Sequence, residues 1–422
     1  MTLRELMRKN GLVRDNIVFF VTSMILNLIG FFYHAYMGRV LGPMQYSILG
    51  VSQSLLYLLN VILNVIQTST ARFVSTYKTR DDKASMSYLF VHGLSYLFFW
   101  GIVSLGFFLL AGTFLVDYLH VPFLVYLYLG LVVPFVYLLA LTRGLLQGLQ
   151  SFIGLGLNNI SEGAVKLLVG VGLVVFGWGV GGAVLGVTLS YVGAFLFSLI
   201  PLRHFFHHPQ KKVEKKLLTA YSLPVLFALL TLTALYSFDV LMVKHYLSEH
   251  EAGLYAAASL LGKVVFFATL SIAMVMFPKI SESYDRRSAS HVKKVLNTSL
   301  FFVVMMFLGI FIFYFLFPEF VILVLFGKTY LEIAPLLWLF ALVYGVFSLI
   351  YSLSMYNLSI HRYTFIYFII LMNLVEVVLI MLYHETLRMV LTMVLGAMAV
   401  LLLYLSWYTY RHKLEESMGS GA

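Results

Sequence analysis

Three ionisable side chains interrupt long apolar stretches of this sequence. At about 1.5 Å per helical residue, Lys166, Lys263 and Glu376 lie about 20, 17 and 20 Å from the start of their stretches. Such depths are near the centre of a bilayer, where a charge is costly unless it is paired or meets water. A buried lysine can bind phosphate as a point charge. These residues therefore predict a polar site inside a membrane protein, with Lys263 favoured to line a cavity.

Two further carboxylates accompany the lysines. Glu162 lies four residues before Lys166 on the same helix face, so a structural ion pair and a functional role are both open. For Lys263, the structural alternative is a pair across helices with Glu376 or another carboxylate. Asp239 lies near the end of its stretch, where it is either a cation-coupling carboxylate or a partly wetted charge at a helix end.

The sequence has twelve apolar stretches, some of which contain the residues named above. Each stretch is long enough to cross about 30 Å of hydrocarbon as a helix. The composition agrees, because 61% of the residues are hydrophobic and only 11% are charged. The sequence therefore predicts an all-α membrane protein with about twelve transmembrane helices. The stretches are residues 17–37, 44–71, 84–110, 122–142, 153–176, 180–202, 217–239, 252–278, 295–318, 333–358, 363–383 and 389–410.

The basic residues alternate between the two sides of the membrane. Of the 28 Lys and Arg residues, two lie inside the stretches and most of the others share a side with both termini. By the positive-inside rule, both termini are expected to be cytoplasmic in a multi-pass protein of a prokaryotic plasma membrane. The charge of +10 is spread over short loops, so it does not predict nucleic-acid binding. The basic residues on the opposite side are Arg39, Lys244, Lys328 and Arg388.

The loops are too short to hold a catalytic domain. The longest, about residues 203–216 and 279–294, are basic and contain no nucleotide-binding motif. The cluster Gly177, Gly179, Gly181 and Gly182 predicts a tight helical hairpin instead. We therefore expect no enzyme and no cofactor, and transport energised by Na⁺, H⁺ or the membrane potential.

A faint internal repeat divides the stretches six and six. At an offset of 207 residues, Arg72 and Tyr77 correspond to Lys279 and Tyr284. Six helices return the chain to its starting side of the membrane, so the two halves of the repeat have the same orientation. Two such lobes are expected to enclose a central cavity suited to alternating access. The expected domains are a lobe over residues 1–210, a lobe over residues 211–416 and a disordered tail over residues 417–422.

Several short segments, in this order and spacing, resemble the polysaccharide flippases of the multidrug/oligosaccharidyl-lipid/polysaccharide (MOP) exporter superfamily. The resemblance extends from about Asn16 to the end of the twelfth stretch. The segments are residues 38–43 (GRVLGP) with Tyr46, 70–74 (TARFV), 143–150 (RGLLQGLQ), 162–166 (EGAVK), Pro224, Asp239 with 252–257 (AGLYAA), 277–282 (FPKISE) and 327–330 (GKTY).

The resemblance implies export of a polyprenyl-diphosphate-linked oligosaccharide from the inner to the outer leaflet, for a surface polysaccharide or glycan. Besides this substrate and the membrane lipids, other polysaccharide-assembly membrane proteins are possible partners. The implied phosphate contacts are Lys263 first, then Arg72, Arg143 and Lys166. The ion-coupling candidates are Asp239, Glu162 and Glu376.

Two alternative functions stay open. A multidrug/cation antiporter would share the fold and use Asp239 for coupling, although two buried lysines suit a cationic drug poorly. A membrane glycosyltransferase or ligase would need catalytic arginines or carboxylates in an external loop, where charges are sparse. Lipid II flippases differ from this chain, because they have arginines in the first span and usually fourteen spans.

Overall fold

The computed structural model describes residues 11–206, 209–211, 222–286 and 288–411. Within these ranges every regular element is a helix and no strand occurs. The predicted all-α membrane fold is therefore confirmed. The predicted disordered tail, residues 417–422, lies outside the described ranges.

The chain packs as two compact units. Unit 1 contains Met1–Leu41 and Leu55–Leu226, and unit 2 contains Gly42–Ser54 and Phe227–Ala422. A short segment from the first half of the chain thus packs with the second half. The division into functional lobes at residues 210 and 211 stays a prediction.

Most helices belong to one unit, and α2 contributes to both. Those of unit 1 are α2 (Gly11–Thr79, in part), α3 (Lys83–Tyr118), α4 (Phe123–Gly130), α5 (Val132–Gly148), α6 (Phe152–Leu173), η1 (Val174–Trp178), α7 (Gly179–Leu202) and η2 (Arg203–Phe206). Those of unit 2 are α8 (Ser222–Ala234, largely), α9 (Phe238–Tyr246), α10 (Glu249–Asp285), α11 (Ala289–Leu316), α12 (Pro318–Leu325), η4 (Lys328–Leu336), α13 (Leu337–Ser359), α14 (Phe365–Leu382) and α15 (Leu387–Arg411).

Ten helical stretches among the described residues are long and apolar enough to cross a membrane. Two of them, Met24–Thr79 with 56 residues and Phe152–Phe206 with 55, are long enough to cross twice. The first breaks at Gly42 (φ 68°, ψ 172°), and the second breaks at Gly177 (φ 88°). Positive φ values of this kind favour glycine, so both breaks are encoded locally. Counting these stretches twice gives the twelve predicted crossings.

Two predicted spans are each divided into two helices. The fourth is divided into α4 and α5 at Leu131, and the seventh is divided into α8 and α9 by residues 235–237. Asp239 therefore lies in the first turn of a new helix, not at the end of a continuous one. Broken helices often place carboxylates and free backbone groups in transporter interiors.

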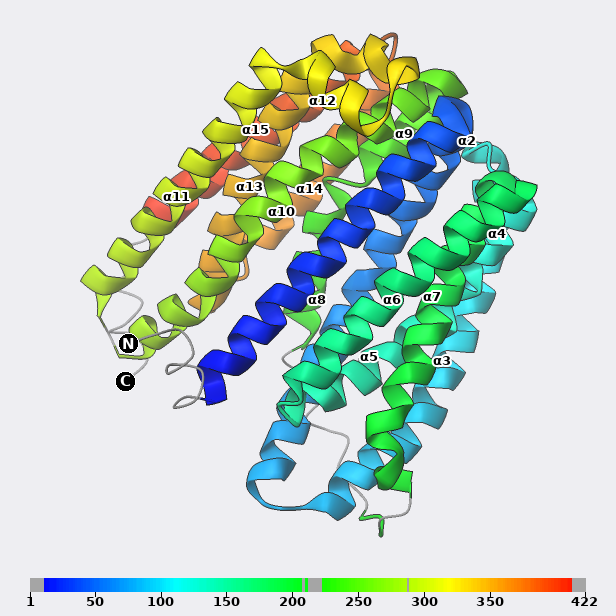
Figure 1. Cartoon of the computed structure of the whole chain (residues 1–422). Helices are drawn as coiled ribbons and strands as arrows, with labels where there is room; N and C mark the ends of the chain where they lie inside the picture. The colour runs from blue at the N-terminus through cyan, green and yellow to red at the C-terminus, as the bar shows by residue number, and fades with distance from the viewer. Residues whose placement is uncertain (1–10, 207–208, 212–221, 287, 412–422) are drawn as a thin grey trace. The chain divides into compact units, whose positions relative to one another are not determined.

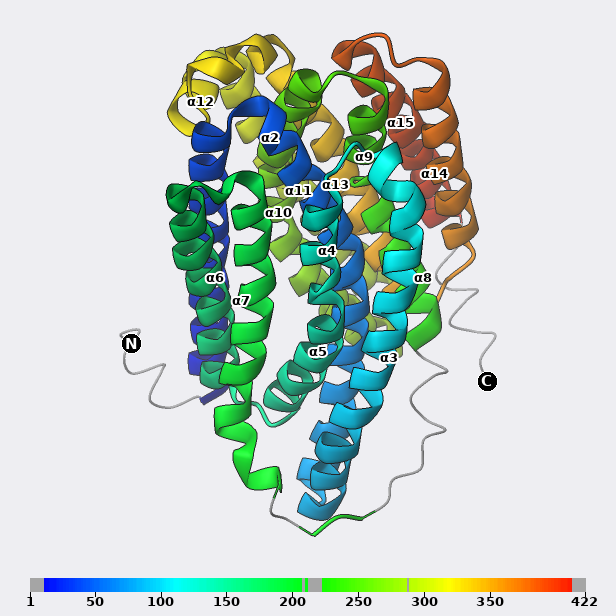
Figure 2. The same ribbon diagram turned by 90° about the vertical axis from the view of Figure 1, so that its right-hand side faces the viewer.

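Small residues allow close helix packing in unit 1. A Cβ atom on Gly144 or Gly148 of α5 would lie 2.6 Å from atoms of Thr70 or Val74 in α2. These glycines, four residues apart, let α5 and α2 approach closely. The glycine cluster forms the predicted hairpin between α6 and α7, which run side by side (Figure 2).

In unit 2, α10, α11, α13 and α15 pack side by side (Figure 1). The segment Gly42–Ser54 packs onto the start of α10, where a Cβ atom on Gly253 would overlap the carbonyl of Pro43. Its Ser47 Oγ accepts a hydrogen bond from the buried Lys244 Nζ (2.9 Å). Close packing and a buried hydrogen bond thus hold this segment in unit 2.

Asp82 caps the start of α3 outside the spans. Its carboxylate accepts hydrogen bonds from the side chain and the backbone N–H of Ser85 (2.7 and 3.0 Å). These bonds stabilise the charged form and hold the pKa of Asp82 below its usual value. The cap fixes the start of the helix that follows the first long α2 stretch.

Candidate functional site

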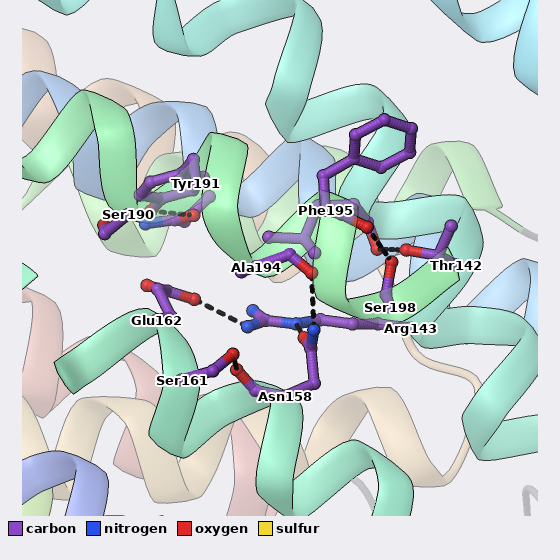
Figure 3. Close-up of polar contacts among 12 residues, drawn as sticks. Thr142, Arg143, Asn158, Ser161, Glu162, Ser190, Tyr191, Ala194, Phe195 and Ser198 are labelled. Atoms are coloured by element: carbon purple, nitrogen blue, oxygen red, sulfur yellow. Dashed lines mark hydrogen bonds and ion pairs between the residues drawn. The ribbon is translucent and has the colours of Figure 1, made fainter. Parts of the chain in front are cut away.

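A buried ion pair lies in the interior of unit 1. Arg143 Nη2 of α5 donates to Glu162 Oε2 of α6 at 2.6 Å, and Arg143 Nε donates to Asn158 Oδ1 at 2.7 Å (Figure 3). Asn158 Nδ2 in turn donates to the Ala194 carbonyl of α7 at 2.6 Å. Three helices are thus joined by one hydrogen-bonded network.

This network changes the predicted pairing of Glu162. The sequence suggested an ion pair between Glu162 and Lys166, but the described residues show no pair between them within 4.0 Å. Asn158 and Glu162 are four residues apart, so both face Arg143, whose guanidinium can bond both at once. Glu162 is therefore neutralised across helices and not along its own helix.

The Lys166 side chain ends beside the aromatic ring of Tyr33. Its Nζ lies 5.1 Å from the centre of the Tyr33 ring, a cation–π distance. Within the described residues it has no ion pair, and a Cβ atom on Gly30 would lie only 3.7 Å from this Nζ. Since Gly30 has no side chain, no Cβ atom contacts the ammonium on that side.

The corresponding site in unit 2 is centred on Asp239, which is 2% exposed. Its Oδ2 accepts a hydrogen bond from the Tyr255 hydroxyl (2.8 Å), and its Oδ1 accepts one from the backbone N–H of Val240 (2.8 Å). Asp239 also interacts electrostatically with Lys263. Two hydrogen bonds thus hold the Asp239 carboxyl group at the helix break between α8 and α9.

Lys263 and Glu376 are also buried, being 4% and 1% exposed. Lys263 Nζ lies 5.6 Å from the centre of the Tyr236 ring. Both carboxylate oxygens of Glu376 lack a hydrogen-bond partner among the described residues. A buried carboxylate without hydrogen-bond donors is costly when charged. Binding of a proton or a cation by Glu376 would therefore lower the free energy of its buried side chain.

Arg72 lies apart from these buried groups. It is exposed in the last part of α2, two turns before Lys78 near the end of the helix. Of the four predicted phosphate contacts, Lys166 and Arg143 lie near Glu162 in unit 1, and Lys263 lies near Asp239 in unit 2.

Sequence reasoning missed the neutral polar residues of the site. Asn158 accepts a hydrogen bond from Arg143, and Tyr255 donates one to Asp239. Tyr191 donates to the amide of Asn60. The spacing of Asn158 and Glu162 was the one available signal, because both lie on the face of Lys166. In the described ranges, no group of three or more His, Cys, Asp or Glu residues is arranged to hold a metal ion.

Comparison with known sequences gives two matches. Residues 12–284 match the family described as "Polysaccharide biosynthesis protein". An uncharacterised membrane protein of Methanocaldococcus jannaschii is 24% identical over 183 residues, which are 40% of this chain and 44% of that protein. The alignment thus spans less than half of this relative.

Comparison with solved structures shows the fold. An inward-facing multidrug resistance MATE family transporter of the MOP superfamily has a TM-score of 0.80 and 14% identity, over 96% of this chain and 99% of that chain. A MOP superfamily transporter from Pyrococcus furiosus, whose binding pocket has reversed polarity suggesting a different function, has a TM-score of 0.70 and 15% identity, over 96% and 95%. Such transporters have the two-lobe fold of twelve helices that the sequence predicts.

Proposed function

Since the chain belongs to the polysaccharide biosynthesis protein family, we propose that it flips a polyprenyl-diphosphate-linked oligosaccharide from the cytoplasmic to the outer leaflet by alternating access. The observation that carries this proposal is the ammonium of Lys166, which lies deep in a span without a close counter-charge. The diphosphate of the carrier would supply that counter-charge.

The physical advantage of such a site is large. Sugars and phosphates that enter hydrocarbon lose their hydrogen bonds to water, at a cost of about 2–7 kcal/mol for each uncompensated polar group and more for a charge. A polar interior replaces part of that hydration. The polyprenyl chain can stay in the lipid because it is apolar.

The geometry orders the proposed phosphate contacts. Lys166 comes first, because its ammonium has no ion pair among the described residues. Lys263 comes second, since Asp239 partly balances its charge, and exposed Arg72 suits a first encounter at the cytoplasmic end of α2. Arg143 comes last, because Glu162 and Asn158 already occupy two of its nitrogen atoms.

Coupling to an ion gradient is assigned to the carboxylates of unit 2. Asp239 is held at a helix break, and buried Glu376 lacks hydrogen-bond donors among the described residues, so H⁺ or Na⁺ binding would relieve its charge. Glu162 is the weakest of the three candidates, because Arg143 already neutralises it. The membrane potential is the remaining energy source.

The proposed setting is the plasma membrane of a prokaryotic cell, with both termini cytoplasmic. The substrate is received from the enzymes that assemble the glycan on its lipid carrier, so other polysaccharide-assembly membrane proteins are the expected partners. The family is one of transporters, and the proposal includes no catalytic step.

One observation favours a second function. The fold is that of MATE transporters, so ion-coupled efflux of a cationic drug is the alternative. The lysines argue against it, because Lys166 and Lys263 would repel a cation in each unit. A drug-efflux measurement separates the two functions.

The deciding experiment measures flipping in proteoliposomes with a fluorescent diphosphate-linked oligosaccharide. Wild type is compared with Lys166→Ala and Lys263→Ala, and with the exposed-lysine control Lys293→Ala. Losing a charged hydrogen-bond partner should slow flipping about tenfold or more for Lys166→Ala, while the control is unchanged. Drug efflux without flipping by wild type would overturn the proposal, and flipping unaffected by either lysine change would overturn only the site.

A further inference from the structure

A row of neutral polar side chains follows one face of the second part of α2. Asn60, Asn64, Gln67 and Thr68 recur at helical spacing, so they lie on one face of the helix. Asn64 and Thr68 are exposed, and Asn60 and Gln67 are half-buried. All four residues belong to unit 1.

The depth of this amide row places it inside the span. Counted from Pro43 at about 1.5 Å per residue, Asn60 and Asn64 lie about 26 and 32 Å along the helix, in the middle and the inner half of the apolar stretch. An amide that faces lipid there would lose the hydrogen bonds of its donors and acceptor. The exposed face must therefore meet water or a polar ligand.

Neighbouring helices fix the ends of the row and leave its centre available. The Tyr191 hydroxyl donates to Asn60 Oδ1 (2.9 Å), and Gln67 Nε2 donates to Gln147 Oε1 (2.9 Å). Between these anchored amides, the Asn64 side chain makes no hydrogen bond to a described residue. Asn64 thus presents one acceptor and two donor hydrogens from a rigid helix.

The predicted internal repeat does not preserve this row. At the offset of 207 residues, Asn60, Gln67 and Thr68 correspond to Phe267, Met274 and Val275 of α10. These three residues are apolar and are 39%, 60% and 55% exposed. Only Asn64 corresponds to a polar residue, Ser271. The amides of the row are therefore missing at the corresponding positions of α10.

The chemistry of the row selects its ligand. A neutral amide both donates and accepts, which matches the hydroxyl groups of a sugar, whereas an anion needs donors only. We propose that Asn60, Asn64 and Gln67, with Gln147 and Tyr191, form a carbohydrate-binding track. The track receives the glycan while Lys166 holds the diphosphate. The glycan's attachment to a lipid carrier rests on the proposed function, but sugar binding does not.

Sugar binding is tested on the full-length protein in nanodiscs by saturation-transfer NMR. The probes are free, unphosphorylated hexose, N-acetylhexosamine and uronic-acid oligosaccharides. The variants are Asn64→Leu, Asn64→Gln, which keeps the amide, and the repeat-related control Ser271→Leu, which changes an exposed residue in α10. Folding is checked by size-exclusion chromatography and thermal unfolding.

We expect wild type and Ser271→Leu to bind at least one probe. Asn64→Leu should bind it about tenfold more weakly, as for the loss of one well-placed hydrogen bond, and Asn64→Gln should bind more tightly than Asn64→Leu. Lys293→Ala, at an exposed position of α11, should leave free-sugar binding unchanged.

Failure of the track and failure of the proposed function give different results. No binding of any probe, or equal binding by wild type and Asn64→Leu, overturns the carbohydrate track even if flipping is observed. Sugar binding that depends on Asn64, without flipping of the diphosphate carrier, supports the track and removes the proposed transport role.

Discussion

At the scale of single residues, the two units differ in how their buried charged side chains are paired. In unit 1, Arg143 neutralises Glu162 through a 2.6 Å contact and leaves Lys166 as the excess charge. In unit 2, the buried carboxylates Asp239 and Glu376 are equalled in number by the buried lysines Lys244 and Lys263, and Lys244 also pairs with Glu249 at 3.2 Å. Under the proposed function, Lys166, which has no ion pair among the described residues, suits an anionic head group, and Glu376, which lacks hydrogen-bond donors among them, suits a coupling cation.

Removal of Arg143 should destabilise the protein strongly. Arg143→Met leaves the Glu162 carboxylate unpaired in a span, which costs about 3–5 kcal/mol in the free energy of unfolding. The double variant Arg143→Met/Glu162→Gln removes that charge and should recover much of the loss. Unfolding by SDS in mixed micelles measures both variants, and equal destabilisation of the single and double variants would contradict an ion-pair role.

Removal of the Asp239 charge should uncouple transport from its ion gradient. Asn at this position still accepts a hydrogen bond from Tyr255, so Asp239→Asn preserves the local structure while removing the cation partner. We expect basal flipping to persist and its stimulation by an H⁺ or Na⁺ gradient to disappear. Glu282→Gln, at an exposed position, is the matched control. Persistent stimulation in both Asp239→Asn and Glu376→Gln would rule out the unit 2 carboxylates.

At the scale of helices, close approach at glycines fixes the packing. Gly253 at the start of α10 lies against the Pro43 carbonyl, and Gly50 lies against Ala256, where an added Cβ atom would be 2.5 Å from the Ala256 Cβ. These contacts attach the segment Gly42–Ser54 to unit 2. A larger side chain at either glycine has to displace a backbone or a well-packed side chain.

Gly253→Ala should therefore reduce stability, although alanine is the better helix former. Its Cβ atom would overlap a backbone carbonyl that cannot rotate away, and overpacking of this kind costs about 1–3 kcal/mol. Gly309→Ala in α11 is the control, because a Cβ atom there has no neighbour within 4 Å. Thermal unfolding in detergent should show a lower midpoint for the first variant and an unchanged or higher one for the second.

The helices were more predictable than their contacts. Apolar length revealed the crossings, and the glycine cluster revealed the hairpin at Gly177, because both are local properties. The partner of Glu162 was not predictable, since Arg143 is distant by 19 residues and meets it only when α5 and α6 pack. The breaks at Leu131 and Tyr236 were also missed, because apolar residues continue through them.

At the scale of the whole molecule, charge asymmetry predicts orientation. The side shared by both termini carries most of the basic residues, so the loop at Asp81 should be cytoplasmic and the loop at Glu385 external. The chain has no cysteine, so a single introduced cysteine is the one position of this chain that a maleimide can label through a thiol. In intact cells an impermeant maleimide should label Glu385→Cys at once and Asp81→Cys only after permeabilisation. The reverse pattern would invert the topology and the direction of transport.

Residues 42–54 are synthesised well before the other residues of unit 2 with which they pack. The chain passes between the two units at 41/42, 54/55 and 226/227, so part of unit 2 leaves the ribosome long before the rest. Residues 42–54 can pack in unit 2 only after α10 has been synthesised, because Gly253 of α10 packs against Pro43. Two fragments cut at 210/211 would leave the later one without this early piece. Such a fragment should mature only when the earlier one is made in the same cell.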